Sequence, residues 1–394
     1  PAWKGSETTF DRALQLIDQG ALQTQTLEQL AERLGITLRY LRELFRKHLG
    51  TSPKTYALYQ QCLFAKQLLH ETSLPVTEIA LAAGFNSIRR FNDCFKQQLA
   101  ITPSEIRKQR QGNSSSITLT LNYRPPFAWQ HMFEFLSART INGLDWTAGK
   151  TYGRTINFQT THGYFEITPI ENKSALKLEV HLNQWQHLRF IVDKVRRLFD
   201  LDANSQAIDQ QLAPLFPKNT LNHEGLRLPG IWSVFEAGIR AILGQQVSVK
   251  AAQNLVTQIV NELGQPLEVN NLTERRLFPT PLAIVESDLD FIKMPGTRKD
   301  TLRCFAQWAI EQSNDNQELG LSDISHNIDS ILELKGIGPW TLDYIKMRGL
   351  SDPDIWLGGD LGIKNAMKQH DLNFDPDLAK PWRSYLTLQT WSYL

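Results

Sequence analysis

The sequence contains little cysteine and no long apolar run, and both absences exclude classes of protein. Its three cysteines, Cys62, Cys94 and Cys304, are far apart in the chain and show no metal-ligand spacing. They predict neither a zinc site nor a four-cysteine iron–sulfur cluster, and we expect buried, reduced thiols. No apolar stretch approaches the roughly 20 residues of a membrane span, and no secretory signal is present. We therefore expect a cytoplasmic protein that does not bind membranes.

The net charge of +1 hides an uneven distribution of charge. Residues 1–112 contain 15 basic and 10 acidic residues, whereas the rest of the chain contains 27 basic and 31 acidic residues. Such an excess suits a DNA-binding module, and a solvated helical surface is the alternative. A chain of 394 residues with 41% apolar content is too long for one core. We expect about two to four domains.

An internal repeat occupies residues 10–108. Four residues recur 49 or 50 positions later, namely Ala31, Gly35, Phe45 and Pro53, which return as Ala80, Gly84, Phe95 and Pro103. In each copy the alanine lets two helices approach closely, and the glycine permits the turn between them. The repeat therefore predicts two helix-turn-helix units. A helical hairpin without a role in DNA binding is the alternative.

The duplicated pattern resembles the AraC-type DNA-binding domain, in which a long helix, here residues 54–71, joins two such units. The resemblance places recognition helices near residues 37–48 and 87–97. It implies double-stranded promoter DNA, and RNA polymerase as a further partner. The side chains expected to reach base edges are Leu38, Arg39, Arg42, Ile88, Arg89 and Asn92. Each arginine contacts phosphate more often than a base in such interfaces.

Composition and periodicity divide the rest of the chain. Residues 111–116 are small and polar, which predicts a linker. The alternating stretches 117–121, 155–158 and 177–180 predict an antiparallel sheet with one buried face, and the pattern turns helical from about residue 186. The expected fold is mainly α. Its domains are a double helix-turn-helix domain (1–110), the linker (111–116), an α+β subdomain (117–215) and a helical helix-hairpin-helix domain (216–394).

A glycine-rich turn and a following acid carry the chemistry. Gly336 and Gly338, just before Thr341, let a tight turn between two helices offer bare backbone N–H groups to a DNA phosphate. Asp360 lies in a second glycine-rich segment after the second helix, where its charge would stabilise positive charge on a sugar. An ordinary turn is the alternative for the glycines, and a helix cap is the alternative for Asp360.

This half of the chain resembles the 3-methyladenine DNA glycosylase II (AlkA) type of the helix-hairpin-helix superfamily. The resemblance is carried by the runs 122–127, 197–201, 225–230, 241–248, 334–340 and 380–385. It implies hydrolysis of the N-glycosidic bond of alkylated, 3-methyladenine-like bases after base flipping. Asp360 would stabilise the oxocarbenium-like sugar and orient water. Strand-cleaving relatives carry a lysine where Trp340 stands, so the resemblance implies a monofunctional enzyme.

The same resemblance assigns further site residues. Aromatic positions of the base pocket fall on Phe135, Trp340, Tyr344 and Trp391, with core packing as the alternative for each. Gln246 stands where the prototype has the leucine that fills the gap left by the flipped base. No cofactor is required, but a structural monovalent cation is expected at the carbonyls of Leu332, Leu334 and Ile337, as in relatives.

Together the two resemblances predict a fusion of the Ada–AlkA type, and residues 1–5 resemble the junction after a zinc-bound methyl-acceptor domain. We expect this chain to lack that domain. The predicted function is a DNA-repair glycosylase fused to a regulator's DNA-binding domain, acting as a monomer on damaged and promoter DNA. One alternative is an adaptive-response transcriptional regulator whose glycosylase half only binds DNA. Another is an enzyme for oxidised or deaminated bases.

Overall fold

The computed structural model describes residues 5–18, 20–107, 116–267, 274–314 and 324–394. Residues 1–4 and most of the predicted linker, 111–115, lie outside the described residues. The chain forms two compact units. Unit 1 comprises Pro1–Leu119 and Leu182–Asp193, and unit 2 comprises Thr120–His181 and Lys194–Leu394. Each is described by itself.

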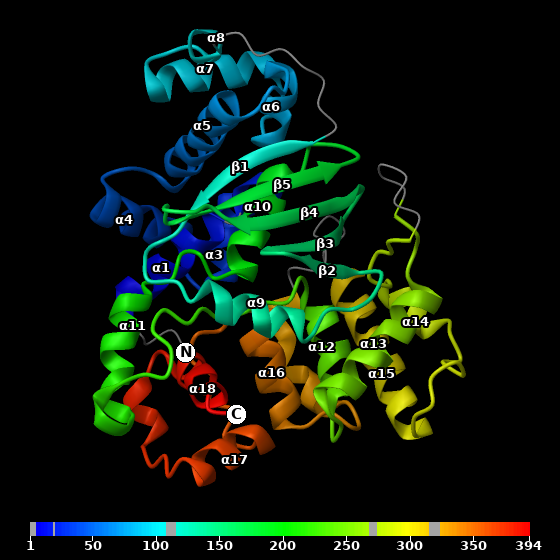
Figure 1. Cartoon of the computed structure of the whole chain (residues 1–394). Helices are drawn as coiled ribbons and strands as arrows, with labels where there is room; N and C mark the ends of the chain where they lie inside the picture. The colour runs from blue at the N-terminus through cyan, green and yellow to red at the C-terminus, as the bar shows by residue number, and fades with distance from the viewer. Residues whose placement is uncertain (1–4, 19, 108–115, 268–273, 315–323) are drawn as a thin grey trace. The chain divides into compact units, whose positions relative to one another are not determined.

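Unit 1 contains the two predicted helix-turn-helix motifs. Its helices are α1 (Gly5–Asp18), α2 (Ala21–Thr24), α3 (Leu27–Arg33), α4 (Leu38–Leu49), α5 (Pro53–Glu71), α6 (Val76–Ala82), α7 (Ile88–Leu99) and α8 (Pro103–Ile106). The pairs α3–α4 and α6–α7 form the two motifs, and α5 is the predicted long helix between them (Figure 1). The prediction of a duplicated helical module is confirmed.

Matching local signals begin the two recognition helices. The Thr37 hydroxyl accepts a hydrogen bond from the Tyr40 amide at 3.2 Å, and the Ser87 hydroxyl accepts one from the Arg90 amide at 3.2 Å. Such N-caps satisfy amides that the first helical turn leaves without partners. The preceding turn uses a glycine with positive φ in both copies, with φ of +68° at Gly35 and +84° in the second copy.

The cysteines correct part of the sequence analysis. Cys62 and Cys94 are buried as expected, but their Sγ atoms lie only 3.9 Å apart because α5 packs against α7. Burial raises the pKa of the Cys62 thiol. Cys304 is exposed, so the expectation of three buried thiols was wrong at that position. Residue type alone does not show whether other elements cover the helix face that carries it.

A five-stranded antiparallel sheet follows the two helix-turn-helix motifs. Its strands are β1 (Ile117–Asn122), β2 (Asp145–Ala148), β3 (Thr151–Phe158), β4 (Thr161–Pro169) and β5 (Ala175–Leu182), in the spatial order β1-β5-β4-β3-β2 (Figure 1). The register of β3 and β4 pairs Arg154 with Phe165. Buried and more exposed residues alternate along β1 and β5, as the sequence predicted for a sheet with one covered face.

The remaining elements are almost entirely helical. They are α9 (Trp129–Ser137), α10 (Leu188–Leu198), α11 (Ser205–Leu212), η1 (Ala213–Leu215), η2 (Pro217–Asn219), α12 (Val234–Gly244), α13 (Val249–Leu263), α14 (Pro281–Val285), α15 (Gly296–Asn314), η3 (Ile324–Glu333), α16 (Pro339–Gly349), α17 (Leu361–Gln369), η4 (Pro376–Ala379) and α18 (Arg383–Trp391). The apolar helix α12 packs closely against α16. Gly349 permits this approach because it has no Cβ, and a Cβ at this position would lie 2.9 Å from Ala237 Cβ. The predicted α+β and helical parts are confirmed.

Two hydrophobic clusters of unit 2 meet at α16. One surrounds α12, α15 and Phe305, and the other contains Leu357 and Tyr385. Tyr344 packs against both clusters, whereas Trp340 packs against the second. The helix that follows the glycine-rich turn therefore carries its aromatic residues to the boundary between two rigid cores.

Candidate active site

The two glycines of the turn have different surroundings. Gly336 adopts φ of +91°, and a Cβ there would lie 2.3 Å from Thr301 Oγ1, so only glycine fits without a shift. A Cβ on Gly338 would meet no atom within 4 Å. Gly338 is also the N-cap of α16, whose first residue is Pro339. The turn thus places an uncovered backbone segment at a helix N-terminus, and phosphate binding there stays a prediction.

Thr341 follows the turn and is buried. We expected it to contact phosphate with the glycines, but it is only 2% exposed. Its hydroxyl accepts a hydrogen bond from Gln245 Nε2 at 3.1 Å, and the same nitrogen donates to the Gly336 carbonyl at 3.0 Å. Gln245, which the sequence analysis did not select, therefore braces the turn together with Thr341. The Thr341 side chain is engaged within the protein, and a role of Thr341 in phosphate binding stays a prediction.

Gln246 projects from the segment between α12 and α13. It is exposed and adopts φ of +57°, whereas the neighbouring Gln245 turns toward the hairpin. Val247 and Val249 are also exposed, at 37% and 50%. An exposed glutamine flanked by apolar side chains has the position and chemistry expected of a wedge, and that role stays a prediction.

Three hydrogen-bond donors converge on the Asp360 carboxylate. Trp391 Nε1 on α18 donates to Oδ1 at 3.0 Å, and Trp340 Nε1 on α16 donates to Oδ2 at 3.2 Å. The amide of Ile363 donates to Oδ1 at 3.2 Å, which makes Asp360 the N-cap of α17. The helix-cap alternative therefore describes the geometry correctly and is compatible with a catalytic role. Both carboxylate oxygens are fixed in direction by groups from separate helices.

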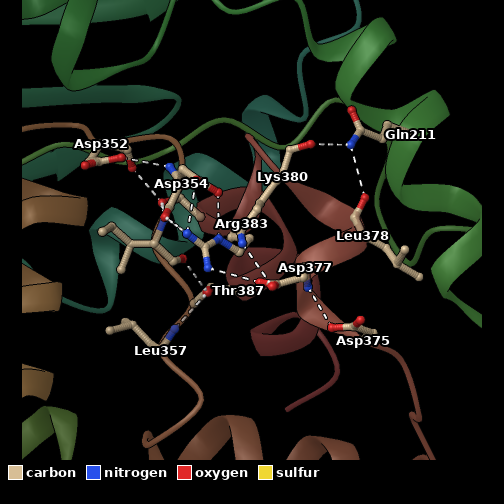
Figure 2. Close-up of polar contacts among 12 residues, drawn as sticks. Gln211, Asp352, Asp354, Leu357, Asp375, Asp377, Leu378, Lys380, Arg383 and Thr387 are labelled. Atoms are coloured by element: carbon tan, nitrogen blue, oxygen red, sulfur yellow. Dashed lines mark hydrogen bonds and ion pairs between the residues drawn. The ribbon is translucent and has the colours of Figure 1, made fainter. Parts of the chain in front are cut away.

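The segment that leads to Asp360 is attached to α18 by hydroxyl groups. Ser384 Oγ accepts a hydrogen bond from the Ile355 amide at 3.0 Å. Thr387 Oγ1 accepts one from the Leu357 amide at 3.3 Å and donates to the Ile355 carbonyl at 3.1 Å (Figure 2). The backbone of this segment therefore forms hydrogen bonds with side-chain hydroxyl groups of α18, the helix that also carries Trp391.

An arginine strengthens the same attachment. Arg383 Nε and Nη2 donate to the two carboxylate oxygens of Asp354 at 2.7 and 3.0 Å, a bidentate pair (Figure 2). Its Nη1 also donates to Oδ1 of Asp377, a residue of η4, at 3.4 Å. The backbone before Asp360, the start of α18 and η4 are thus held in one arrangement.

The predicted aromatic residues form one continuous group. The rings of Trp340 and Tyr344 are stacked with centroids 5.4 Å apart and planes at 26°. Phe135 on α9 lies farther along, joined to Tyr344 through Arg348, whose guanidinium carbon is 4.8 Å from the Phe135 centroid and 5.6 Å from that of Tyr344. The structure therefore brings the predicted aromatic residues and Asp360 into one region. Their contact with a base stays a prediction.

Two arginines in this region were missed by the sequence analysis. The guanidinium carbon of Arg139 lies 3.7 Å from the Phe135 centroid, so Phe135 has only part of its ring surface left for a base. Burial, and to a smaller extent the nearby Arg348, lowers the pKa of Arg139 to about 10. The position of Arg348, four residues after Tyr344 on one helix, was a signal in the sequence that could have found it.

The expected cation site has a defined backbone. The Ile337 amide donates to the Leu334 carbonyl at 3.1 Å, and the side chain of Leu332 is exposed. A carbonyl oxygen can accept one hydrogen bond and still offer a lone pair to a cation. The assignment of Leu332, Leu334 and Ile337 as cation ligands stays a prediction.

The expected DNA-reading side chains lie on the first two turns of α4 and α7. All are exposed except the partly buried Leu38, and the set is Leu38, Arg39, Arg42, Ile88, Arg89 and Asn92. Arg39 Nε lies 3.1 Å from Glu43 Oε1, yet the arginine side chain is 89% exposed. The opposite faces of both helices are buried through Phe45 and Phe95. Base contacts by these residues stay a prediction.

Comparisons with known proteins agree with both units. A model described as "AlkA N-terminal domain" matches residues 118–233, and one described as "Helix-turn-helix domain" matches residues 30–109. The chain is 30% identical over 413 aligned residues to the "Probable bifunctional transcriptional activator/DNA repair enzyme AlkA" of Mycobacterium tuberculosis, covering 100% of this chain and 82% of the relative. It is 31% identical over 278 residues to "DNA-3-methyladenine glycosylase 2" of Escherichia coli K12, covering 69% of this chain and 96% of that protein.

A solved structure supports the fold. The 3-methyladenine DNA-glycosylase from Archaeoglobus fulgidus superposes with a TM-score of 0.56 at 18% identity, covering 70% of this chain and 97% of that one. Within the described residues, no helix is both long and apolar enough to cross a membrane.

The fold and the arrangement around Asp360 define a helix-hairpin-helix DNA glycosylase module preceded by an AraC-type double helix-turn-helix module. The chain belongs to the AlkA family, in the form in which the glycosylase is fused to a regulator's DNA-binding domain.

Proposed function

We propose that the chain removes alkylated, 3-methyladenine-like bases from double-stranded DNA by hydrolysing their N-glycosidic bond. The observation that carries this proposal is the Asp360 carboxylate, oriented by the indole N–H groups of Trp340 and Trp391. The side chains that orient the acid are themselves aromatic and half-buried. A sugar beside the acid would thus have its base beside aromatic rings.

In this mechanism the damaged nucleotide first leaves the helical stack, which costs a few kcal/mol and least for a damaged pair. The bond between C1′ and the base nitrogen breaks, and its electron pair leaves with the base. The Asp360 carboxylate stabilises the positive charge that develops on the sugar. Water then bonds to C1′ through its oxygen and loses a proton, which the base or the carboxylate accepts. The products are a free base and an abasic site.

The enzyme is proposed to be monofunctional. A lyase needs an amine that forms a Schiff base with C1′, and the position at which strand-cleaving relatives carry it is Trp340. The Trp340 N–H is directed at the carboxylate, and Lys335 lies on the other side of the two glycines. This arrangement supports hydrolysis without strand cleavage.

Further roles are proposed for the surrounding groups. The N–H groups at Gly336 and Gly338 hold a DNA phosphate, and Gln246 enters the gap left by the flipped base. A monovalent cation at the carbonyls of Leu332, Leu334 and Ile337 reinforces the hairpin, and no other cofactor is needed. The helix-turn-helix residues bind promoter DNA, where RNA polymerase is the expected further partner. The protein acts as a monomer.

Incubation of the whole chain with randomly methylated duplex DNA tests the proposal. Chromatography of the supernatant should show released methylated purines, and a denaturing gel should show intact strands until alkali is added. Strand breaks without alkali would contradict the monofunctional assignment. No release, with DNA binding retained, would favour a regulator whose glycosylase half only binds DNA.

A further inference from the structure

A cavity of about 120 Å³ lies inside unit 1, beside the second helix-turn-helix motif. Its walls come from α1 and α2, from the first half of α5, from the turn before α7, and from Arg189 on α10. Ile17 and Phe85, which are 1% and 3% exposed, make part of the lining apolar. A water molecule takes up roughly 30 Å³ of the liquid, so the cavity admits several waters or one small ligand. All of its lining residues belong to unit 1, so it is not part of the candidate active site.

One wall of the cavity joins the second helix-turn-helix motif to α5. Gln61 on α5 is 8% exposed, and its Nε2 donates a hydrogen bond to the Gly84 carbonyl at 3.2 Å. Gly84 has φ of +84°, and a Cβ there would lie 2.9 Å from Gln61 Nε2. Only glycine therefore lets the turn approach α5 so closely. A ligand in the cavity would contact both the long helix and the turn that leads into α7.

A buried arginine gives the cavity its chemical character. Arg189 lines the cavity and is 7% exposed. Its Nη2 donates to the Asp18 carbonyl at 3.5 Å, and its Nε lies 4.0 Å from Asp193 Oδ2. Both contacts are long, so they compensate the buried charge only in part, and a poorly compensated buried charge costs free energy. A guanidinium can donate two parallel hydrogen bonds to a carboxylate or a phosphate, so an oxyanion in the cavity would stabilise Arg189.

Two exposed cations also line the cavity. They are Lys54, near the start of α5, and Arg90, on α7. Among the described residues, neither forms an ion pair, and none of the residues that line the cavity is acidic. A concave surface lined by charges of one sign attracts ions of the opposite sign. Arg189 is too deeply buried to reach the backbone phosphate of a double helix, which favours a free anion over DNA as the ligand.

We propose that this cavity binds a small free anion through its carboxylate or phosphate group, with Arg189 as the main ligand-binding residue, and that the bound anion weakens the binding of DNA by unit 1. The bound anion adds negative charge beside Arg90 on the recognition helix α7. Because coupling between two sites is reciprocal, DNA would weaken the binding of the anion by the same factor. The binding site is independent of the proposed glycosylase reaction, whereas its effect on DNA rests on the proposed DNA binding by α4 and α7.

NMR titration of the isotope-labelled whole chain tests the binding site, with inorganic phosphate and benzoate as separate probes of the two oxyanion groups. At least one probe should bind with a Kd of about 1 mM or tighter and shift the amide resonances of Gly84 and Asn86, which border the cavity. Arg189→Gln should weaken this binding at least about tenfold. Arg12→Gln, which changes an exposed arginine of α1 outside the cavity, is the matched control and should leave the binding unchanged.

The outcomes of the titration decide for or against the site. Equal binding by Arg189→Gln and the wild type would overturn the inference, because the anion would then bind elsewhere. Absence of binding by both probes would overturn it as well. Circular dichroism shows whether Arg189→Gln is folded. If it is not, Lys54→Gln changes an exposed side chain and should weaken the binding about twofold to threefold, and unaltered binding by that variant would contradict the inference.

DNA affinity at constant ionic strength tests the coupling. A saturating concentration of the bound probe should lower the affinity of the wild type for duplex DNA about fivefold, and that of Arg189→Gln much less. An unchanged affinity of the wild type would overturn the coupling. A chain that does not bind DNA even without the probe would instead overturn the proposed DNA binding. A smaller salt dependence of DNA binding in Arg189→Gln, with neither probe bound by the wild type, would assign the cavity to the DNA backbone and overturn the inference.

Discussion

The two units of this chain present their functional groups in opposite ways. In unit 1, Arg39 and Arg42 are exposed on a capped helix, and Arg39 has only a surface ion pair. In unit 2, Asp360 is held by the Trp340 and Trp391 side chains and by one backbone amide. Side chains that are proposed to contact DNA can stay exposed without fixed partners, because the DNA would supply those partners. A carboxylate that is proposed to be catalytic must be oriented before charge develops on the substrate.

The units also differ in where they bury charge. The first helix-turn-helix motif closes on an apolar cluster that includes Phe10 and Phe45. Unit 2 joins the buried Arg154 and Glu236 and the partly buried Arg240 in one network, with the Arg154–Glu236 pair at 2.6 Å and the Arg240–Glu236 pair at 2.8 Å. Burial alone would raise the pKa of Glu236, but Arg154 and Arg240 lower it. Such networks hold a specific arrangement and tolerate the loss of a member poorly.

The largest effect is expected from a variant that breaks this network. Glu236→Gln leaves Arg154 and Arg240 buried with less compensation, and we expect it to destabilise unit 2 by about 3–5 kcal/mol. Chemical denaturation followed by hydrogen exchange should show early loss of protection in α12, while α4 and α7 keep theirs. Equal loss of protection in both units would show that they do not unfold separately.

A second prediction concerns pH and Asp200, which accepts hydrogen bonds from the Leu228 amide and the Tyr385 hydroxyl. Burial raises the pKa of Asp200 to about 6, although the hydrogen bond from the Leu228 amide opposes this rise. Because this pKa exceeds that of an unfolded aspartate, its contribution to stability is complete below about pH 4 and is lost as the pH rises through 6. Asp200→Asn should gain about 2–3 kcal/mol relative to the wild type between pH 4 and 7. A constant difference would contradict the raised pKa.

A third prediction sharpens the idea of an oriented acid. Trp391→Phe keeps an aromatic ring and removes the N–H that bonds Asp360, so base release under single-turnover conditions should slow about tenfold. Trp382→Phe is the matched control, since its ring packs edge-on against Tyr385. Equal rates for both variants would show that the indole N–H does not orient the acid.

The smallest effect is expected in unit 1. Arg42→Ala should reduce the slope of log affinity against log salt by about 0.9 if the side chain neutralises one phosphate. Its release of methylated bases from a short duplex should stay unchanged. Arg12→Ala, an exposed arginine on α1, is the control and should leave the slope unaltered. A fall in base release by Arg42→Ala would show that unit 1 also contributes to the glycosylase reaction.

The same contrast decides what the sequence could predict. The recognition helices follow from local signals, since Thr37 and Ser87 cap them and Gly35 and Gly84 form the preceding turns. Strands followed from alternation, whereas α5 was predicted from the resemblance to the AraC-type domain. Caps, turns and alternation depend on neighbours within a few residues, so a repeated pattern reveals them.

The details of the site depend on contacts between distant segments. Asp360 was found from its glycine-rich setting and a family resemblance, but the convergence of Trp340 and Trp391 on its two oxygens required three helices to meet. The burial of Thr341 and the bracing by Gln245 join positions 96 residues apart. Spacing does not show which side of a turn faces inward, so the sequence did not reveal that the Thr341 side chain is buried.

The most direct test of the account measures chemistry and binding on the same variant. Asp360→Asn keeps the size of the side chain and an oxygen that can accept from one indole, but it removes the charge. Base release from methylated DNA should fall at least about a thousandfold, while the affinity for DNA that contains a stable abasic analogue changes by less than about tenfold. Asp371→Asn, an exposed acid beyond α17, should match the wild type. Undiminished release by Asp360→Asn would contradict the account, because the oriented carboxylate would then not perform the chemistry.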